Sequence, residues 1–376
     1  MQVLRIDSLS PYRALVGVGG IGTGCFFALE GNQTLGRNES RPGRLVDIRD
    51  YCKLHIVSHY VAKLLGASCP EDEFRVLPLG LVGNDAAGRQ VMKEMAEVGI
   101  DTSMVRMVDG KPTLFSICFQ YPDGSGGNIT TSNSAAAALG DADVDAVAKV
   151  LSSGGKRVIA LAAPEVPLKA RRHFLQLATR SGAFRAASFV SSELREARQS
   201  GMFELLDMVS LNEGEAAEVV GEAFSLDSAD SFVVKCQDFL RSAHPNMRMV
   251  VSAGARGAYG LTCELWNYCP APSVAVASTA GAGDALLGGI IAAMAAGIPL
   301  LKPRPAGQSL ASAQLETALD FGVLLASYKC LSPHTIHPDA CLTTLIDYAG
   351  SLNLSFGSSL QQFFDQIATS GPALSH

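Results

Sequence analysis

The chain has 376 residues, of which 48% are hydrophobic and 18% are charged, and its formal net charge is −6. This composition favours one large α/β domain with at most a small appendage, and it excludes a disordered chain. No basic block stands out, so nucleic acid is not expected as a partner. The longest apolar run, 285–298, is shorter than the roughly 20 residues that span a bilayer, so no membrane partner is expected. Nine cysteines without a CxxC pair indicate free thiols and a cytoplasmic location.

Short apolar and β-branched runs alternate with helical patterns along the chain, which predicts βαβ units on a mainly parallel sheet. The expected strands are 14–19, 74–82, 113–121, 157–162, 205–211, 247–252 and 273–277. The expected helices are 57–65, 86–98, 141–151, 213–220, 284–296 and 315–331. Gly288 and Gly289 lie inside one of these helices. Because glycine lowers helix stability, we expect a close backbone contact there.

Two segments are expected outside this layered body. Residues 31–44 are polar and rich in Gly and Pro, which is typical of a lid or of a plain surface loop. A small lid is predicted from parts of 31–45 and 113–131. Residues 346–376 are predicted to be a C-terminal extension, in which 358–369 has the apolar spacing of one helical face. That amphipathic helix either docks on the domain or contacts a partner, so a homodimer remains open.

The segment 279–284 (TAGAGD) joins a predicted strand to a predicted helix. Main-chain N–H groups at a helix start carry partial positive charge, and small residues let a phosphate approach them. A carboxylate in this place would repel a bound anion. Asp284 is therefore interpreted as a base that takes the proton of a hydroxyl beside the phosphate. The alternative is that Asp284 simply caps the helix.

Two further elements precede this turn in the chain. Asn212 and Glu215 lie on one face of a predicted helix, where an amide and a carboxylate can hold Mg²⁺ through its waters. The same pair could instead form a capping box. Gly254 and Gly257 follow a predicted strand, and their small size lets a nucleotide lie against the backbone.

The order of Asn-x-x-Glu, a Gly-x-x-Gly turn and a Gly-Ala-Gly-Asp helix start resembles the ribokinase-like (PfkB-type) carbohydrate kinases. The segment 79–88 (LGLVGNDAAG) and the turn 99–102 (GIDT) are also similar to that family. The resemblance covers roughly 14–345. It implies an α/β fold with three layers, α/β/α, a mainly parallel central sheet and a small β lid, within a kinase domain of 1–345.

The resemblance also implies an activity, namely ATP- and Mg²⁺-dependent transfer of the γ-phosphoryl group to a small-molecule hydroxyl substrate. That acceptor would be a small sugar, a polyol or a nucleoside. Asp284 would be the base. The anion hole would be formed by Gly281, Ala282 and Gly283. The nucleotide would contact Gly254, Gly257 and Thr279, and Mg²⁺ would be held through water by Asn212 and Glu215.

The acceptor half departs from the family pattern. No acid follows the first strand in 18–23, and 50–56 replaces a Gly-Gly-x-x-x-Asn segment. Ser278 stands where the family often has an aspartate linked to a monovalent cation site. These departures favour an alternative, a catalytically idle ribokinase-like protein that binds a nucleotide or ligand and has a regulatory role. A third interpretation, a nicotinamide-dependent oxidoreductase, rests only on the GxGxxG match at 17–22, which lacks its βαβ context.

Overall fold

The computed structural model of the protein describes residues 2–67, 74–123, 125–224, 229–243, 245–303 and 314–366. At its centre is a nine-stranded sheet with the order β14-β13-β12-β11-β10-β9-β2-β5-β6. Neighbouring strands are parallel from β12 to β6, and only β13 and β14 run antiparallel to their neighbours. The strands are β2 (Ala14–Val18), β5 (Arg75–Gly83), β6 (Val105–Val108), β9 (Val158–Ala162), β10 (Phe184–Ser188), β11 (Met208–Asn212), β12 (Arg248–Ser252), β13 (Gly257–Leu261) and β14 (Trp266–Pro270).

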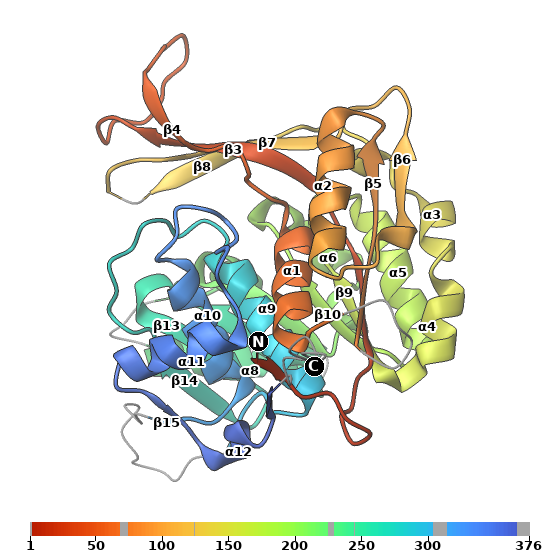
Figure 1. The fold of residues 1–376 in the computed structure, drawn as a ribbon, viewed down its shortest axis with the longest axis vertical. Coiled ribbons are helices and arrows are strands. Elements are labelled where there is room, and N and C mark those ends of the chain that lie inside the picture. The colour runs from red at the N-terminus through yellow and green to blue at the C-terminus, as the bar shows by residue number, and fades with distance from the viewer. Residues whose placement is uncertain are drawn as a thin grey trace, which may run out of the picture.

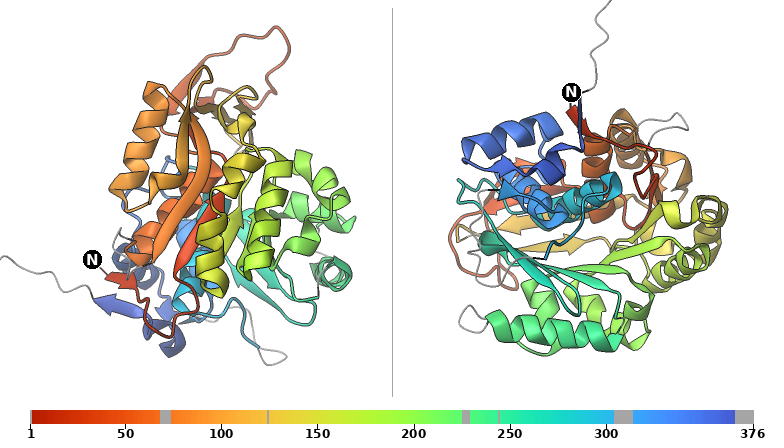
Figure 2. Two further views of the ribbon diagram at one scale, coloured as in Figure 1. Left: turned by 90° about the vertical axis from the view of Figure 1, so that its right-hand side faces the viewer. Right: turned by 90° about the horizontal axis from the view of Figure 1, so that it is seen from below.

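Helices cover both faces of this sheet, as the view from below shows (Figure 2). One layer contains α1 (Lys53–Leu65), α2 (Ala86–Glu97), α9 (Ala282–Ala296), α10 (Ala318–Lys329) and α11 (Leu342–Ser351). The opposite layer contains α3 (Asp141–Asp145), α4 (Ala148–Gly154), α5 (Leu168–Ser181), α6 (Leu194–Gln199), α7 (Glu213–Val220) and α8 (Ala229–Ala243). The predicted three-layer α/β/α fold is therefore confirmed.

Successive side chains of the central strands point to opposite faces of the sheet, and this explains why helices pack on both faces. In β9, Ile159 and Leu161 face the core beneath α1 and α9, whereas Ala160 faces the core beneath α5. Every residue of this strand is buried. Parallel strands buried on both faces read as continuous apolar runs, and this is why the sequence marks them clearly.

Helix α9 is apolar on all sides because it packs between α1 and α10. A Cβ on Gly288 would lie 3.0 Å from the Tyr60 side chain of α1. A Cβ on Gly289 would lie 3.0 Å from the Cα of Gly322 in α10. The close backbone contact predicted for these two glycines is confirmed, and it fixes α9 firmly in the body.

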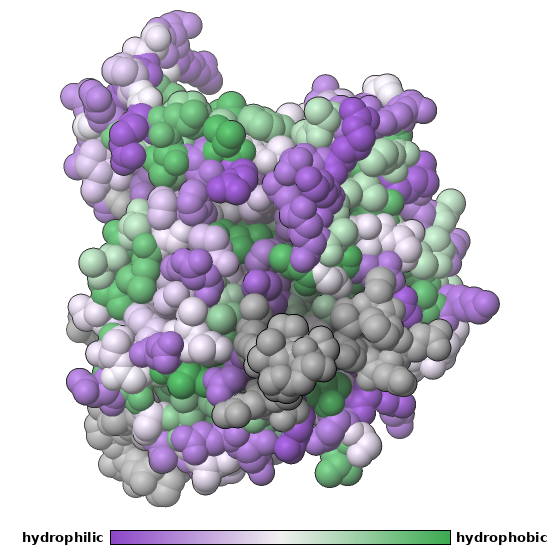
Figure 3. Space-filling view, in the orientation of Figure 1, coloured by the Kyte–Doolittle hydropathy of each residue, from purple (hydrophilic) through white to green (hydrophobic). Residues whose placement is uncertain are grey.

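The lid is a separate four-stranded sheet with the order β4-β3-β7-β8, which extends as an arm above the body in Figure 1. Its strands are β3 (Gly22–Leu29), β4 (Gly43–Asp47), β7 (Leu114–Gln120) and β8 (Gly126–Thr130). Hydrophobic residues gather over these strands in Figure 3. Strands β7 and β8 also contain three exposed hydrophobic residues, Phe115, Ile117 and Ile129. Strand β3 is a lid strand that the sequence analysis did not assign.

Two expectations differ from the structure. The strand predicted over 273–277 is wrong, because this exposed segment is irregular and pairs with no strand among the described residues. The amphipathic helix predicted over 358–369 is only α12 (Ser358–Gln361), and β17 (Phe364–Gln366) pairs antiparallel with β1 (Gln2–Leu4) instead. Residues 367–369 lie outside the described residues. The glycine-rich motif at 17–22 leads into β3 and starts no helix, which removes the basis for a dinucleotide site.

Two short strands complete the fold, β15 (Gln314–Leu315) and β16 (Ser355–Phe356), which pair in parallel. Within the ranges that the structure describes, no helix is both long enough and apolar enough to cross a membrane.

Candidate active site

The turn over 279–283, for which the sequence predicts phosphate binding, leads into α9. Gly281 is the N-cap of the helix and has φ +77°, a left-handed conformation that favours glycine. A Cβ there would also lie 2.5 Å from the main-chain oxygen of Thr335. The N–H of Ala282 donates to Thr279 O at 3.1 Å, whereas the N–H groups of Gly281 and Gly283 have no acceptor among the described residues. These two free donors can bind a phosphate oxygen.

Asp284 lies in the first turn of α9, and only 8% of its surface is exposed. It does not cap the helix, because the N-cap is Gly281 and no side-chain capping bond is present. Its Oδ1 forms an ion pair with Lys53 Nζ at 3.7 Å. Burial raises the pKa of Asp284, and the Lys53 ammonium opposes this shift by favouring the charged form. The geometry thus leaves the carboxylate available to accept a proton.

Lys53 begins α1 and contacts two acids, Asp284 through its ammonium group and Glu165 through its main chain. Its main-chain N–H donates to Glu165 Oε2 at 3.2 Å. Burial raises the pKa of Glu165 to about 7, even though the Lys53 ammonium acts to lower it. Glu165 has φ +74°, a strained conformation for a residue with a side chain, and such strain is concentrated at functional sites. A Cβ on Gly20 would lie 2.5 Å from the Glu165 Cβ, so Gly20 makes room for this acid.

Asp50 connects this group to the lid. It accepts hydrogen bonds from Ser116 Oγ and Cys118 Sγ of β7, both at 2.9 Å. Its own N–H donates to Gly24 O of β3 at 3.2 Å. Burial raises the pKa of Asp50, and its hydrogen bonds to the lid partly offset that shift. The hydrogen bonds of Asp50 therefore connect the lid strands β3 and β7 to the chain just before α1.

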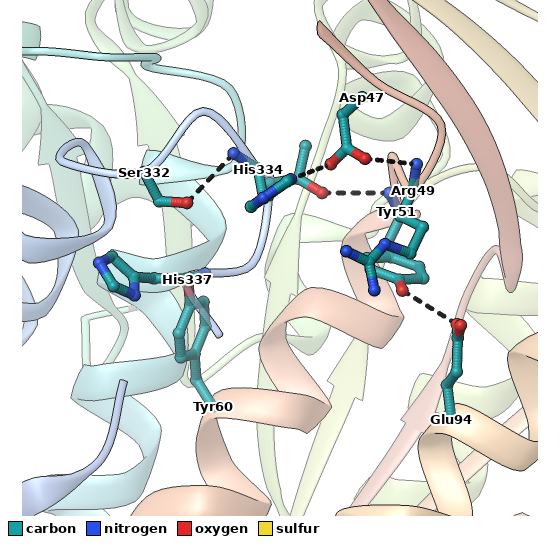
Figure 4. A network of polar contacts seen from close by, with 9 residues as sticks. Asp47, Arg49, Tyr51, Tyr60, Glu94, Ser332, His334 and His337 are labelled. Carbon is teal, nitrogen blue, oxygen red and sulfur yellow. Dashed lines mark hydrogen bonds and ion pairs between the residues drawn. The ribbon is translucent and has the colours of Figure 1, made fainter. Parts of the chain in front are cut away.

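A loop after α10 links the turn over 279–283 to the base of the lid. Thr335, whose carbonyl packs on Gly281, accepts a hydrogen bond at its Oγ1 from the N–H of Tyr51 at 3.2 Å. His334 pairs through Nδ1 with Asp47 at the end of β4 (Figure 4). The loop thus contacts both the turn and the segment that joins the lid to α1.

A cavity of about 710 Å³ opens on the other side of the turn. Six of its lining residues are site residues predicted from the sequence: Asn212, Gly254, Gly257, Thr279, Ala282 and Gly283. Val274, Val276 and Leu286 add apolar surface to the wall. A cavity of this size with an apolar wall and a polar end fits a nucleotide.

The two glycines of the turn after β12 differ in what they do. Gly257 has φ +112°, and a Cβ there would lie 2.0 Å from Cys269 O in the neighbouring strand. Its conformation is thus required by the β13–β14 hairpin. Gly254 has φ +56°, and a Cβ there would meet nothing within 4 Å. Gly254 therefore leaves open space at the cavity wall.

Asn212 and Glu215 form a reciprocal capping box at the start of α7. The Asn212 N–H donates to Glu215 Oε2 at 2.9 Å, and the Glu215 N–H donates to Asn212 Oδ1 at 2.8 Å. Burial raises the pKa of Glu215, and the Lys53 charge counteracts it. Among the described residues, no group of three or more His, Cys, Asp or Glu side chains could hold a metal directly. The capping box uses only one Glu215 oxygen, so the other carboxylate oxygen could accept a hydrogen bond from a metal-bound water.

Sequence reasoning missed Lys53, Glu165 and Asp50. Glu165 follows a fully buried strand, which was a usable signal, because the carboxyl ends of parallel strands line the sites of open α/β sheets. Lys53 and Asp50 lie in the segment that replaces the family's glycine-rich one, and only the fold shows what they contact.

The chain matches the pfkB family of carbohydrate kinases over residues 57–340, and it belongs to that family. No sequence among curated proteins matches it. Three solved structures with a similar fold illustrate the family's range.

Ribokinase from Cryptococcus neoformans var. grubii serotype A in complex with ADP has a TM-score of 0.67 and 19% identity, over 89% of this chain and 99% of that one. Ribokinase from Arabidopsis thaliana complexed with ribose and ATP has a TM-score of 0.62 and 18% identity, over 91% and 99%. The nucleoside kinase from Burkholderia thailandensis in complex with inosine has a TM-score of 0.64 and 15% identity, over 90% and 97%. At these identities the similarity establishes the fold.

Proposed function

We propose that this protein transfers the γ-phosphoryl group of ATP to a hydroxyl of a small sugar, polyol or nucleoside. One observation carries the proposal: the buried Asp284 carboxylate directly follows a turn whose Gly281 and Gly283 N–H groups have no acceptor among the described residues, and it pairs with Lys53. A base beside an anion-binding turn, with polar groups on its other side, is the arrangement that phosphoryl transfer to an alcohol needs.

On the donor side, the cavity of about 710 Å³ would take the nucleotide, with its phosphates toward Thr279 and Gly283. The free N–H groups of the turn would stabilise the charge that develops on the transferring phosphoryl oxygens. A bound Mg²⁺ would neutralise phosphate charge, and Asn212 and Glu215 would hold it through water. Structures of two family relatives hold ADP, or ribose and ATP, and this supports ATP as the donor.

On the acceptor side, Asp284 would take the hydroxyl proton as the oxygen attacks. Burial raises the pKa of Asp284, and the Lys53 charge opposes this by favouring the ionised carboxylate, which is the form that can act as a base. Glu165 and Lys53 together offer a hydrogen-bond acceptor and a donor to the ring or chain that carries the hydroxyl. They would replace the acid and the asparagine that the family pattern has elsewhere.

The competing proposal is a protein that binds a nucleotide or ligand without catalysis, and the departures from the family pattern in the acceptor half first suggested it. The ionisable groups Lys53, Glu165 and Asp50 around Asp284 argue for catalysis, since a cluster of groups with shifted pKa values in one place is typical of catalytic sites. ADP release with a panel of sugars, nucleosides and polyols separates the two functions. A catalyst consumes ATP with a matching acceptor, whereas an idle protein binds ATP and leaves it intact across the whole panel.

Replacing Glu215 tests the magnesium role. Glu215→Gln keeps an oxygen that can accept the Asn212 N–H, so the helix cap survives and stability falls by at most about 1 kcal/mol. We expect the apparent Mg²⁺ affinity to fall about 10- to 100-fold, with transfer partly restored at high Mg²⁺ concentration. The measurement is a Mg²⁺ titration of initial rates. Glu218→Gln, an exposed position of the same helix, is the control. An unchanged titration for Glu215→Gln would make Glu215 a structural cap.

Replacing Lys53 tests how the base is kept ionised. The Lys53 charge lowers the pKa of Asp284, so its removal raises that pKa, and Glu165 moves in the same direction. A base works only when deprotonated, so the acidic limb of kcat against pH should move to higher pH in Lys53→Met. The rate should recover toward its plateau as the pH rises. Lys63→Met, on the same helix, is the control. A limb at the wild-type position would contradict this role of Lys53.

A further inference from the structure

A lysine that the proposed reaction does not use is fully buried under the phosphate-binding turn. Lys329 is the last residue of α10, and none of its surface is exposed. Its Nζ donates a hydrogen bond to the main-chain oxygen of Ser278 at 2.9 Å. No carboxylate of the described residues lies within 4.0 Å of that Nζ in an ion pair. Buried lysines are rare unless they are paired, so a carbonyl as the bonded partner requires an explanation.

The same short segment holds the turn at a second point. The carbonyl of Cys330 accepts hydrogen bonds from the N–H groups of Ala277, at 2.8 Å, and Ser278, at 3.3 Å. Residues 277 and 278 are thus fixed from both sides, by the ammonium of Lys329 and by the next carbonyl along the chain. The turn that carries Thr279, Gly281 and Gly283 begins immediately afterwards.

The bond from Lys329 also acts on a donor at the cavity. The carbonyl of Ser278 and the N–H of Thr279 belong to one peptide unit, and Thr279 lines the nucleotide cavity. A cation bonded to the oxygen of a peptide polarises the unit and strengthens its N–H as a donor. The positive charge of Lys329 thereby reaches the side of the turn where phosphate oxygens would lie.

This lysine does not stabilise the fold electrostatically. Burial lowers the pKa of Lys329 to about 8, and the negative charges of Asp50 and Asp284 offset the desolvation only in part. A lysine whose pKa is lower in the folded chain than in the unfolded one disfavours folding while it is charged, and this cost disappears only as the pH rises past the unfolded value. The charge at neutral pH therefore has no explanation in stability.

We propose that Lys329 is a tethered cation that positions and charges the phosphate-binding turn, so that transfer by this protein needs no free monovalent cation. The inference rests on the proposed phosphotransferase function. Lys329 is a positioning residue, because it acts through the Ser278–Thr279 peptide. A main-chain carbonyl that binds an ammonium group can also bind potassium. Removing the side chain should therefore create a requirement for an added cation.

The test compares wild-type protein with Lys329→Met, which keeps the buried stem, and Lys329→Ala, which leaves space for an ion. Lys302→Met, at an exposed lysine paired with Glu316, is the matched control. Initial rates of phosphoryl transfer are measured at saturating ATP and Mg²⁺, in potassium, ammonium or choline chloride at one ionic strength. Thermal unfolding and ATP binding are measured for every variant.

We expect wild-type rates that vary less than about twofold among the three salts. Lys329→Met should lose about tenfold or more in kcat, within the range for weakened stabilisation of the transferring group, with little change in unfolding temperature. Potassium or ammonium, but not the larger choline, should restore part of the rate of Lys329→Ala. A merely structural lysine would give no such selective rescue.

Several results overturn the inference. If the wild-type protein requires potassium or ammonium for transfer, the inference is wrong, and this result holds even if both variants fail to fold. The inference is also wrong if Lys329→Met has the wild-type kcat, or if choline restores the rate of Lys329→Ala as well as potassium does. If the wild-type protein transfers phosphoryl groups to no acceptor, the proposed function fails and this inference fails with it. If wild-type transfer occurs but needs a free cation, only the role of Lys329 is wrong.

Discussion

Asp284→Asn should reduce phosphoryl transfer by about 10²- to 10⁴-fold, because asparagine cannot accept the proton of the attacking hydroxyl. The substitution is nearly isosteric. Since the cap of α9 is Gly281, the loss at the helix start is limited to a charge–dipole interaction of about 0.3–1 kcal/mol. ATP affinity should hold or increase slightly, because a carboxylate that repels the γ-phosphate is gone. The measurement is kcat with a competent acceptor at saturating ATP and Mg²⁺.

The control for this variant is Asp141→Asn. Asp141 is also an acid in a first helical turn, and it pairs with Lys169 at 3.1 Å on the opposite helical layer. A helix-dipole or ion-pair effect on stability would appear in both variants, whereas loss of the base would appear only in Asp284→Asn. Near-normal transfer by Asp284→Asn would show that another group takes the proton.

Gly283→Ala should leave the fold intact and still remove most of the activity. A Cβ at Gly283 meets nothing within 4 Å, and alanine is favoured over glycine inside a helix by about 1 kcal/mol. The unfolding temperature should therefore stay or rise. The added methyl group would occupy the space beside the free N–H groups, where the phosphoryl group is expected, so transfer should fall about 10²-fold or more.

Gly281→Ala is the matched comparison for that variant. It also adds one methyl group to the turn, but φ is +77° and the Cβ would lie 2.5 Å from Thr335 O. This variant should lose both stability and activity through strain. Unfolding scans with parallel rate measurements distinguish the two. Wild-type activity in Gly283→Ala would contradict phosphate binding at this turn.

The sequence was sufficient to predict the layers, and it singled out several residues that line one cavity, because both kinds of signal are local in the chain. Buried parallel strands such as β9 read as unbroken apolar runs. The turn before Asp284 is a run of small residues whose anion-binding geometry follows from a helix start. Asn212 and Glu215, three residues apart, are adjacent on any helix.

The acceptor half could not be predicted because its contacts join distant parts of the chain. Lys53 is hydrogen-bonded to Glu165, which lies 112 positions away along the chain, and Asp50 is hydrogen-bonded to Ser116, which lies 66 positions away. Neither pair has a periodicity that a sequence window detects. Lys329 is similar, since nothing near it in the chain indicates that its ammonium bonds the carbonyl of Ser278, 51 positions away.

The tail was predicted wrongly for the same physical reason. The spacing of Leu360, Phe363 and Phe364 is that of a helical face. Yet Phe364 pairs with Leu4 in the register of β1 and β17, at the other end of the chain. A long-range partner overrides a local helical pattern, which is a weak preference in a short segment.

The central claim is that a phosphoryl group moves from ATP to a hydroxyl with Asp284 as the base. The most direct measurement is phosphorus NMR of ATP and Mg²⁺ incubated with each acceptor of the panel, for the wild-type protein and Asp284→Asn. The proposed function predicts a new phosphate-ester signal with at least one acceptor for the wild-type protein, and that signal should be nearly absent for Asp284→Asn. ATP left unchanged, or only free inorganic phosphate, with every acceptor would contradict it, as would equal ester formation by the two proteins.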